Sequence, residues 1–301
     1  MNQRRRIFQS AVFVVTLTGI ASAAVLISPG KLPSSLAYAQ ARLDLGTFAT
    51  IDPTGSTFTD ANGINPRGDI VGRYVIAGVS HGFLLSEGEF TTIDFPGASF
   101  NYAIGINSNG DIVGVYLMSG VGHGFLLTEG AFTTIDFPGA RYTEARAINP
   151  DGDIVGWYVA ADHKTHGFLL SGGNFTTIDP PGAAATRALG INPDGKIVGL
   201  YFNTAKGMVC GFQLSGGEFS TITFPGASVT FATGINPLGD IVGSEFSGGQ
   251  FRGYLLRDGD FTPIDVPGAS RVLGNNISPR GDILGSYARS GVTHGFLLTR
   301  D

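Results

Sequence analysis

One internal repeat constrains what this chain can fold into. An Ile-Asn pair, replaced by Ile-Ser in the last copy and followed by Gly-Asp-Ile-Val-Gly or a close variant, recurs six times. Its first isoleucine stands at Ile64, Ile106, Ile148, Ile191, Ile235 and Ile277. The spacings are 42, 42, 43, 44 and 42 residues. A period of this length indicates one supersecondary unit that is copied along the chain and stacks on its neighbours.

Each unit contains four short segments typical of β-strands. The first ends at Ile-Asn, and the second reads Asp-Ile-Val-Gly-x-Tyr. The third reads HGFLL or a variant, starting at His81, His123, His166, Cys210, Arg252 and His294. The fourth reads FTTID or a variant, starting at Phe48, Phe90, Phe132, Phe175, Phe219 and Phe261. Aromatic and β-branched residues fill these segments, and Gly, Pro, Asn or Asp separates them. Four strands in about 42 residues match one propeller blade, so we expect an all-β, six-bladed β-propeller.

The two ends of the repeat region complement each other. A fourth-type segment, Phe48 to Asp52, precedes the first complete unit, and the last unit stops after the third-type segment, Gly295 to Leu298. Pairing these two segments would close a ring and remove two unpaired sheet edges. An open solenoid is the alternative, but solenoids need atypical capping repeats at their ends. The sequence therefore predicts that the N-terminal strand completes the last blade.

The N-terminal segment is typical of a signal peptide. Three arginines, residues 4–6, precede an apolar run from Ile7 to Ile27, and the small-residue site Ala37-Tyr38-Ala39 follows. We expect cleavage after Ala39, so that residues 1–39 form the signal and residues 40–301 the propeller domain. An uncleaved membrane anchor is the alternative, because the apolar run approaches spanning length. The arginine pair leaves the Sec and twin-arginine export routes both open.

Charge and cysteine content exclude some classes of partner. The whole chain has a formal net charge of −5, and the predicted signal carries four of its positive charges and no acid. An acidic exported domain without a basic stripe is not typical of nucleic-acid binding. Cys210 is the only cysteine, so no intrachain disulfide can form. We expect a monomer that is secreted, periplasmic or at the cell surface, without a membrane segment after cleavage.

The recurring motifs resemble a known repeat. Gly-Ile-Asn-x-x-Gly-Asp-Ile-Val-Gly followed by His-Gly-Phe-Leu-Leu is similar to the HAF-type extracellular repeat of uncharacterised secreted bacterial proteins. The resemblance covers nearly all of Phe48 to Leu298, with glycine where that family has alanine in its His-Ala-Phe motif. It implies a secreted bacterial β-repeat protein, and it brings no catalytic residue to this chain.

The stretch from Asn149 to Asp153, Asn-Pro-Asp-Gly-Asp, has the composition of a calcium loop. However, a type I turn also favours Asn, Pro and Gly at its first, second and fourth positions. An EF-hand would need a glutamate at the twelfth position, where Ala160 stands. The equivalent turns replace one of the two aspartates by Arg67, Lys196, Leu238 or Arg280. We therefore expect structural turns, no metal site and no cofactor; calcium in this turn or at Asn107 to Asp111 is the alternative.

Two further repeated positions carry side chains that could take part in chemistry. The histidines of the third segment occupy one position in different blades, so they cannot converge on one zinc ion. We expect each to hydrogen-bond a neighbouring loop. The second segment carries a repeated tyrosine, which Glu245 replaces in one unit. Because this carboxylate departs from the pattern, it becomes a candidate functional residue.

The segments that differ between repeats indicate where a ligand would bind. Only the loop between the second and third segments changes length, and in a propeller it shares a face with the segment joining successive blades. Recognition commonly uses loops on a rigid scaffold. The predicted ligand-binding residues are Tyr102, Arg141, Glu144, Arg146, Trp157, Arg187 and Glu245. We expect a shallow loop site near Arg141, Glu144, Arg146 and Trp157, and we predict no catalytic residue.

These observations favour a secreted β-propeller that acts as a binding or interaction module for glycans or another cell-envelope component. The alternative is an extracellular hydrolase or lyase with its site at the mouth of the propeller channel. A second alternative is a purely structural surface protein, since near-identical units could serve that role.

Overall fold

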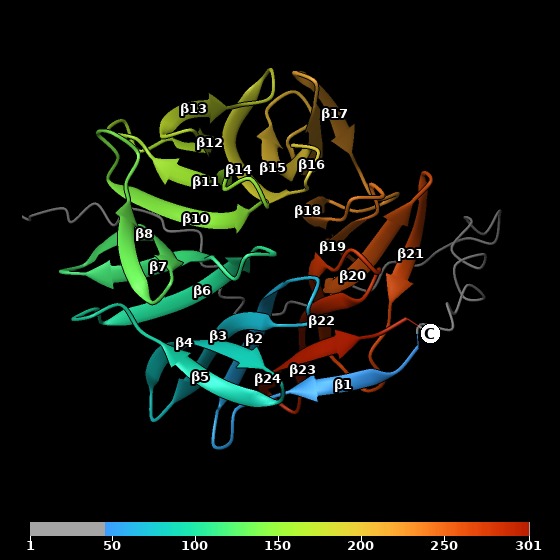
Figure 1. Cartoon of the computed structure of the whole chain (residues 1–301). Helices are drawn as coiled ribbons and strands as arrows, with labels where there is room; N and C mark the ends of the chain where they lie inside the picture. Colours follow the sequence, from blue (N-terminus) through green and yellow to red (C-terminus); the bar gives the residue numbers. More distant parts are fainter. Residues whose placement is uncertain (1–45, 301) are drawn as a thin grey trace, which may run out of the picture. The chain divides into compact units, whose positions relative to one another are not determined.

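The structure is a computed structural model that describes residues 46–300. The expected signal peptide, residues 1–39, lies outside the described residues. Residues 46–300 form 24 β-strands, which confirms the all-β prediction (Figure 1). This range contains no helix that could span a membrane.

The strands follow the four segments of the repeat. The first strands are β2 (Phe58–Ile64), β6 (Phe100–Ile106), β10 (Tyr142–Ile148), β14 (Ala183–Ile191), β18 (Val229–Ile235) and β22 (Arg271–Ile277). The second strands are β3 (Ile70–Ile76), β7 (Ile112–Met118), β11 (Ile154–Val159), β15 (Ile197–Asn203), β19 (Ile241–Ser247) and β23 (Ile283–Arg289). The third strands are β4 (Val79–Ser86), β8 (Val121–Thr128), β12 (Thr165–Ser171), β16 (Met208–Ser215), β20 (Gln250–Arg257) and β24 (Val292–Leu298). The fourth-type strands are β1 (Phe48–Ile51), β5 (Glu89–Ile93), β9 (Ala131–Ile135), β13 (Asn174–Ile178), β17 (Glu218–Ile222) and β21 (Asp260–Ile264).

Successive strands of each repeat pair antiparallel, as short hairpin connections require. The fourth-type strand beside β24 is β1, which pairs with it from Phe48 opposite Leu298 to Ile51 opposite Gly295. The first strands contact one another in sequence order, and β2 contacts both β6 and β22. They lie nearest the centre of the domain in Figure 1.

The Asn-Pro-x-Gly-Asp stretches are structural turns, as expected. In the turn at Asn149, the Gly152 N–H donates to the Asn149 carbonyl over 3.1 Å, and Gly152 has φ +85°. The Asn149 side-chain oxygen accepts from the N–H groups of Asp151 and Asp153, and its Nδ2 donates to the Asp153 carboxylate over 3.0 Å. The asparagine and the aspartate therefore both stabilise the turn through hydrogen bonds within it. Residues 46–300 contain no group of three or more His, Cys, Asp or Glu side chains placed to hold a metal ion.

The glycine of the Ile-Val-Gly motif is required by close packing. A Cβ on Gly156 would lie 2.0 Å from the Glu144 carbonyl oxygen and 2.8 Å from the Phe168 ring. The equivalent glycines of the other repeats, Gly72, Gly114, Gly199, Gly243 and Gly285, meet the same two kinds of neighbour. The glycine thus lets an aromatic ring of the third strand pack directly on the backbone of the second.

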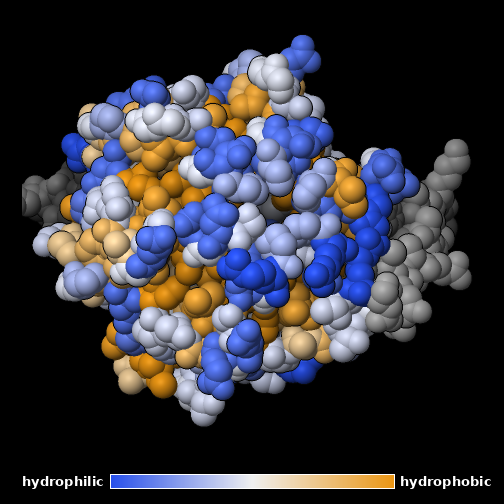
Figure 2. Space-filling view, in the orientation of Figure 1, coloured by the Kyte–Doolittle hydropathy of each residue, from blue (hydrophilic) through white to orange (hydrophobic). Residues whose placement is uncertain are grey.

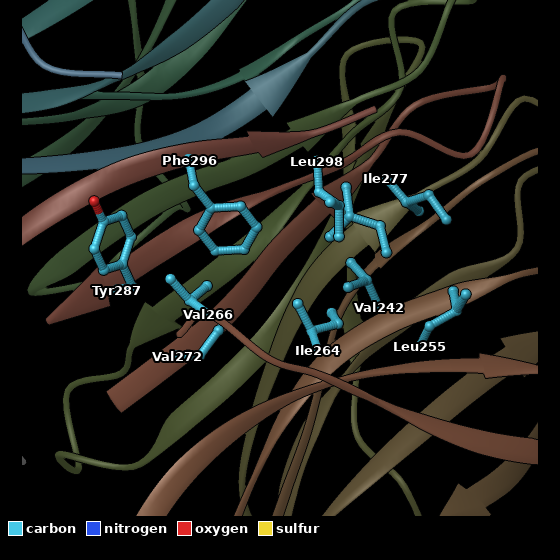
Figure 3. Packing of buried hydrophobic residues seen from close by; sticks show 10 residues of the cluster. Val242, Leu255, Ile264, Val266, Val272, Ile277, Tyr287, Phe296 and Leu298 are labelled. Carbon is cyan, nitrogen blue, oxygen red and sulfur yellow. The ribbon is translucent and has the colours of Figure 1, made fainter. Parts of the chain in front are cut away.

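The hydrophobic core is distributed between neighbouring four-stranded groups. Figure 3 shows one cluster in which side chains of β19, β20 and β21 meet those of β22, β23 and β24. Its members include Val242, Leu255, Ile264, Ile277, Tyr287, Phe296 and Leu298. Full burial of one such aliphatic or aromatic side chain contributes about 1.5–3 kcal/mol. Each sheet is therefore stabilised mainly by packing against the next one.

Repeated polar contacts join the second, third and fourth strands of most groups. His81 Nδ1 lies 2.7 Å from the Asp94 carboxylate, and the Tyr74 ring stacks on His81 at 5.3 Å. The histidine pairs recur as His123–Asp136, His166–Asp179 and His294–Asp52. Each tyrosine hydroxyl also bonds a threonine, in the pairs Tyr74–Thr92, Tyr116–Thr134, Tyr158–Thr177, Tyr201–Thr221 and Tyr287–Thr50. The expectation that these histidines bond nearby loop residues is confirmed.

Large hydrophobic side chains also reach the surface at scattered positions. They are Phe48, Val79, Phe90, Val121, Phe202, Leu238 and Val292. On the face shown in Figure 2, hydrophobic residues lie between hydrophilic ones rather than apart from them. Single exposed apolar side chains of this kind are ordinary in soluble proteins.

Candidate functional site

In the last five residues of every first strand, two positions vary while the others are almost always Ala, Gly or Ile. The earlier one holds Asp60, Tyr102, Glu144, Arg187, Phe231 and Leu273. The later one holds Asn62, Ile104, Arg146, Leu189, Thr233 and Asn275. At the later position the register with the second strand shifts by one residue in all six groups, which marks a β-bulge. A bulge interrupts the strict alternation of side chains along a strand. The 3.1 Å contact between Glu144 and Arg146 shows that the two positions of that strand nevertheless bring their side chains together.

Tyr102 of β6 connects to two neighbouring first strands. Its hydroxyl lies 2.6 Å from an Asp60 carboxylate oxygen and 2.9 Å from the Asn62 side-chain oxygen, both on β2. The other Asp60 oxygen accepts from the Asn275 Nδ2 of β22 over 2.8 Å. Burial and the negative charge of Asp60 hold the pKa of Tyr102 well above its usual value, so the hydroxyl remains a donor.

The Arg73 side chain lies over aromatic rings beside this group. Arg73 is opposite Asp60 in the β2–β3 ladder. Its guanidinium carbon is 4.4 Å from the ring centroid of Phe58, 5.3 Å from that of Phe100 and 5.2 Å from that of Tyr102. The Arg73 Nε is buried and has no hydrogen-bond partner within residues 46–300.

A second group forms around Glu144 of β10. The Tyr142 hydroxyl donates to the Glu144 carboxylate over 2.7 Å, and Arg146 Nη1 donates to its other oxygen over 3.1 Å. Trp157, opposite Glu144 on β11, stacks on Tyr142 with ring centroids 4.8 Å apart. The Arg187 guanidinium of β14 lies 4.2 Å from the Trp157 ring centroid. Glu144 is buried, whereas Arg146, Trp157 and Arg187 are half-buried.

Electrostatic interactions connect the two groups. Burial lowers the pKa of Arg146. The Glu144 carboxylate, the Tyr102 hydroxyl and the Asp60 carboxylate raise it by more, so the net shift of this pKa is upward. Burial also lowers the pKa of Arg187; Glu144 opposes this and the positive charge of Arg146 adds to it, so the net shift is downward. We name the two groups together the axial cluster. Its members are Asp60, Asn62, Arg73, Tyr102, Tyr142, Glu144, Arg146, Trp157, Arg187 and Asn275.

Five of the predicted ligand-binding residues lie in the axial cluster. They are Tyr102, Glu144, Arg146, Trp157 and Arg187. The expectation of a shallow loop site needs correction, because these residues belong to strands β6, β10, β11 and β14. The segments that join successive groups are mostly strand rather than loop. The polar residues in those segments are therefore part of the sheets.

The other two predicted residues lie elsewhere. Arg141 is exposed in the turn before β10, where its backbone N–H donates to the Val159 carbonyl. Glu245 of β19 is opposite Arg252 on β20, and only 2% of its surface is exposed. One Glu245 oxygen accepts from the Ser247 hydroxyl, while the other is buried without a partner among the described residues. Burial raises the pKa of Glu245.

The sequence interpretation did not select Asp60, Asn62, Arg73, Tyr142 or Asn275 as ligand-binding residues. A signal for most of them exists. Asp60, Asn62 and Asn275 occupy the two variable positions of the first strand, and Tyr142 begins its first strand two residues before Glu144. Arg73 occupies the variable position of the second segment, which Trp157 fills in its own repeat, and it lies opposite Asp60 in the β2–β3 ladder.

The opposite ends of the first strands surround a small cavity of about 100 Å³. Isoleucine and asparagine residues of all six repeats line it, with a proline from every repeat except the one that has Ser108. The six repeats therefore converge on one central space. The axial cluster lies towards the beginning of the same strands, and this cavity lies where the strands end.

The sequence matches no family model and no curated protein. Solved structures are similar in fold. A Xanthomonas campestris protein described as a gluconolactonase matches with a TM-score of 0.53 at 15% identity, over 94% of this chain and 99% of that one. The Aleuria aurantia lectin matches with a TM-score of 0.50 at 13% identity, over 81% and 93%. The β-propeller domain of the Trilobed protease from Pyrococcus furiosus matches with a TM-score of 0.50 at 11% identity, over 80% and 95%.

The described domain is a β-propeller. Radially arranged sheets in this fold place their first strands around the central axis. The contacts among β2, β6, β10, β14, β18 and β22 agree with that arrangement. The axial cluster therefore lies at the centre of the propeller, and one rigid scaffold positions its charged and aromatic side chains.

Proposed function

We propose that this chain is a secreted binding module built on a six-bladed propeller, and that the axial cluster is its ligand site. The strands form two four-stranded and two eight-stranded sheets, and each eight-stranded sheet is two four-stranded groups joined by a single parallel pair, β24 with β2 or β16 with β18. This grouping supports six blades, and the pairing of β1 with β24 supports closure of the ring by the N-terminal strand. Export to the periplasm, cell surface or medium is supported by the signal-peptide pattern in residues 1–39. The likeness of the motifs to HAF-type repeats agrees with such a protein.

The observation that carries the proposal is the arrangement of planar groups around Trp157. Tyr142 stacks on this ring and Arg187 lies over it, while Arg146 and Glu144 form an ion pair beside it. Proteins bind polar ligands with apolar faces through such rings and charge-assisted donors. Glycans and other envelope components have this mixed character, so they are the ligands we propose.

Binding is favoured over catalysis by how the two carboxylates are held. Glu144 accepts hydrogen bonds from Tyr142 and Arg146, and Asp60 is bonded by Tyr102 and Asn275. Carboxylates with two donors each suit a positioning role better than proton transfer. Propeller neighbours include both a described gluconolactonase and a lectin, so the fold alone supports either role. A purely structural role would not require an unrepeated charged cluster at half-buried positions.

A binding screen with a single aromatic variant tests the proposal. Residues 40–301 are screened by thermal shift against neutral and acidic glycan fragments, since a ligand of the folded state raises Tm with its concentration. We expect Trp157→Ala to weaken binding by about tenfold or more, because Arg187 loses the ring that holds it. Phe202→Ala is the control, as this exposed ring of β15 lies outside the cluster. Equal binding by the Trp157 variant and wild type would exclude this site, and turnover of a fragment would favour an enzyme.

A further inference from the structure

The axial cluster contains more positive than negative groups. It holds Arg73, Arg146 and Arg187 but only two carboxylates, Asp60 and Glu144. Among residues 46–300, Arg146 pairs with Glu144, and no ion pair engages Arg73 or Arg187. Both of those guanidinium groups instead lie over aromatic rings. This excess of positive charge occurs in a chain whose net charge is −5, so it is a local feature.

Hydrogen-bond donors in the cluster lack acceptors. The Nε atoms of Arg73 and Arg146 are buried, and neither has a partner within the described part of the chain. A buried donor without an acceptor is destabilising, and it is uncommon in folded proteins. Both arginines are half-buried, so an anion bound at the exposed part of these side chains would offset their uncompensated positive charge.

The guanidinium groups are also held in fixed orientations near one another. Trp157 supports the plane of Arg187, and Glu144 anchors one end of Arg146. Glu144 lies opposite Trp157 in the β10–β11 ladder, so the guanidinium groups of Arg146 and Arg187 adjoin the same pair of residues. Two like charges in a half-buried site repel each other, and an anion between them would relieve that repulsion.

We propose that the axial cluster recognises the carboxylate of an acidic sugar, a uronic acid residue within a glycan. Arg146 and Arg187 donate to the carboxylate of the sugar. A planar guanidinium matches a planar carboxylate in a two-bond geometry, and pre-positioning of the donors by stacking limits the entropy lost on binding. This inference rests on the proposed binding function and specifies the ligand class of the same site.

Matched ligands provide the first test. Isothermal titration of residues 40–301 uses oligogalacturonate, oligomannuronate and hyaluronan fragments, each beside its methyl ester, which retains the sugar and removes the charge. We expect at least one acid to bind and its ester to bind about tenfold or more weakly, as the loss of charge-assisted hydrogen bonds implies. Raising the salt concentration should weaken binding of the acid and leave binding of the ester nearly unchanged.

Variants connect the effect to the cluster. Arg187→Gln should reduce the affinity for the acid to that for the ester, while binding of the ester stays the same. Arg187→Lys should give an intermediate affinity, because it retains charge but not the planar pair of donors. Arg280→Gln, which removes an exposed arginine from a turn outside the cluster, should match wild type.

The possible outcomes distinguish the proposed binding function from the proposed ligand class. Equal affinity for an acid and its ester, with both lost in Trp157→Ala, would overturn the acidic-sugar inference and leave the binding function standing. Preference for sulfated over carboxylated fragments would overturn the carboxylate assignment. Failure of every acidic and neutral fragment to bind would overturn both proposals. The comparison of acid with ester uses only wild-type protein, so it does not depend on whether the variants fold.

Discussion

At the scale of single residues, Glu245 shows how a repeat tolerates one exception. The other five groups have at this position a tyrosine whose hydroxyl bonds a threonine of a fourth-type strand. In the group of Glu245, Pro263 stands where that threonine would be, and Arg252 replaces the histidine. The carboxylate is consequently buried with one oxygen unpartnered. This group therefore departs from the repeat at three neighbouring positions, Glu245, Arg252 and Pro263. The only hydrogen bond of the Glu245 carboxylate within the described residues comes from Ser247.

Removing the charge of Glu245 should stabilise the protein near neutral pH. An unfolded glutamate ionises near pH 4.3, whereas burial raises the pKa in the folded state. Stability is therefore lost as pH rises from about 4.3 through the folded pKa, and it stays lower above that pKa. We expect Glu245→Gln to raise Tm at pH 7 and to have no such effect below about pH 4. Thermal unfolding at both pH values measures this, with the exposed Glu218→Gln as a control; a pH-independent effect would contradict it.

At the scale of strands and turns, each first strand combines a constant part with two variable positions. The constant part ends in a turn whose asparagine side chain bonds the backbone and the following aspartate. The variable part contains the β-bulge and presents different side chains in each repeat. The same strand therefore joins the blades and displays the candidate site.

The turn asparagine should be important for stability. Asn149 is buried, and Asn149→Ala removes the acceptor for two N–H groups and the donor to Asp153. We expect a loss of about 2 kcal/mol in the free energy of unfolding, because three part-buried hydrogen bonds are lost and each contributes roughly 0.5–1.5 kcal/mol. Asp151→Ala, an exposed change in the same turn, should lose much less. Urea unfolding measures both, and similar losses for the two variants would show that the side-chain bonds add little.

Sequence reasoning predicted the strands and turns well, because turn chemistry and aromatic or β-branched runs act locally. It did not predict the bulge at Arg146, since an extra residue within a strand leaves composition unchanged. It also assigned Tyr102 and Glu144 to loops, although both lie within strands. Contacts such as that of Tyr102 with Asp60 join residues of different repeats, and no pattern within one repeat specifies them.

At the scale of the whole molecule, the contact of β1 with β24 reproduces those inside the other groups. Ile51 is opposite Gly295 just as Ile93 is opposite Gly82, and both isoleucines are buried. His294 bonds Asp52 at 2.7 Å, the same distance as between His81 and Asp94. The strand nearest the N-terminus thus has the environment of an internal fourth-type strand.

Two matched substitutions test the proposed closure of the ring. Ile51→Ala should lower the free energy of unfolding by about 3 kcal/mol, as expected for a buried isoleucine that leaves a cavity. Ile93→Ala, at the equivalent internal position, should have a similar effect. Chemical unfolding curves of the two variants provide the comparison. A negligible loss for Ile51→Ala beside a large loss for Ile93→Ala would mean that β1 adds little to stability.

The histidine–aspartate pairs differ in the number of residues between their two members, and this difference affects the order of folding. His81 and Asp94 are 13 residues apart, whereas Asp52 and His294 are 242 apart. In the unfolded chain, bringing the second pair together costs roughly 2.5 kcal/mol more in loop-closure entropy. Contacts of low sequence separation form fastest, so the intervening sheets fold first and bring the two ends near each other. We therefore expect β1 to pair with β24 late in folding.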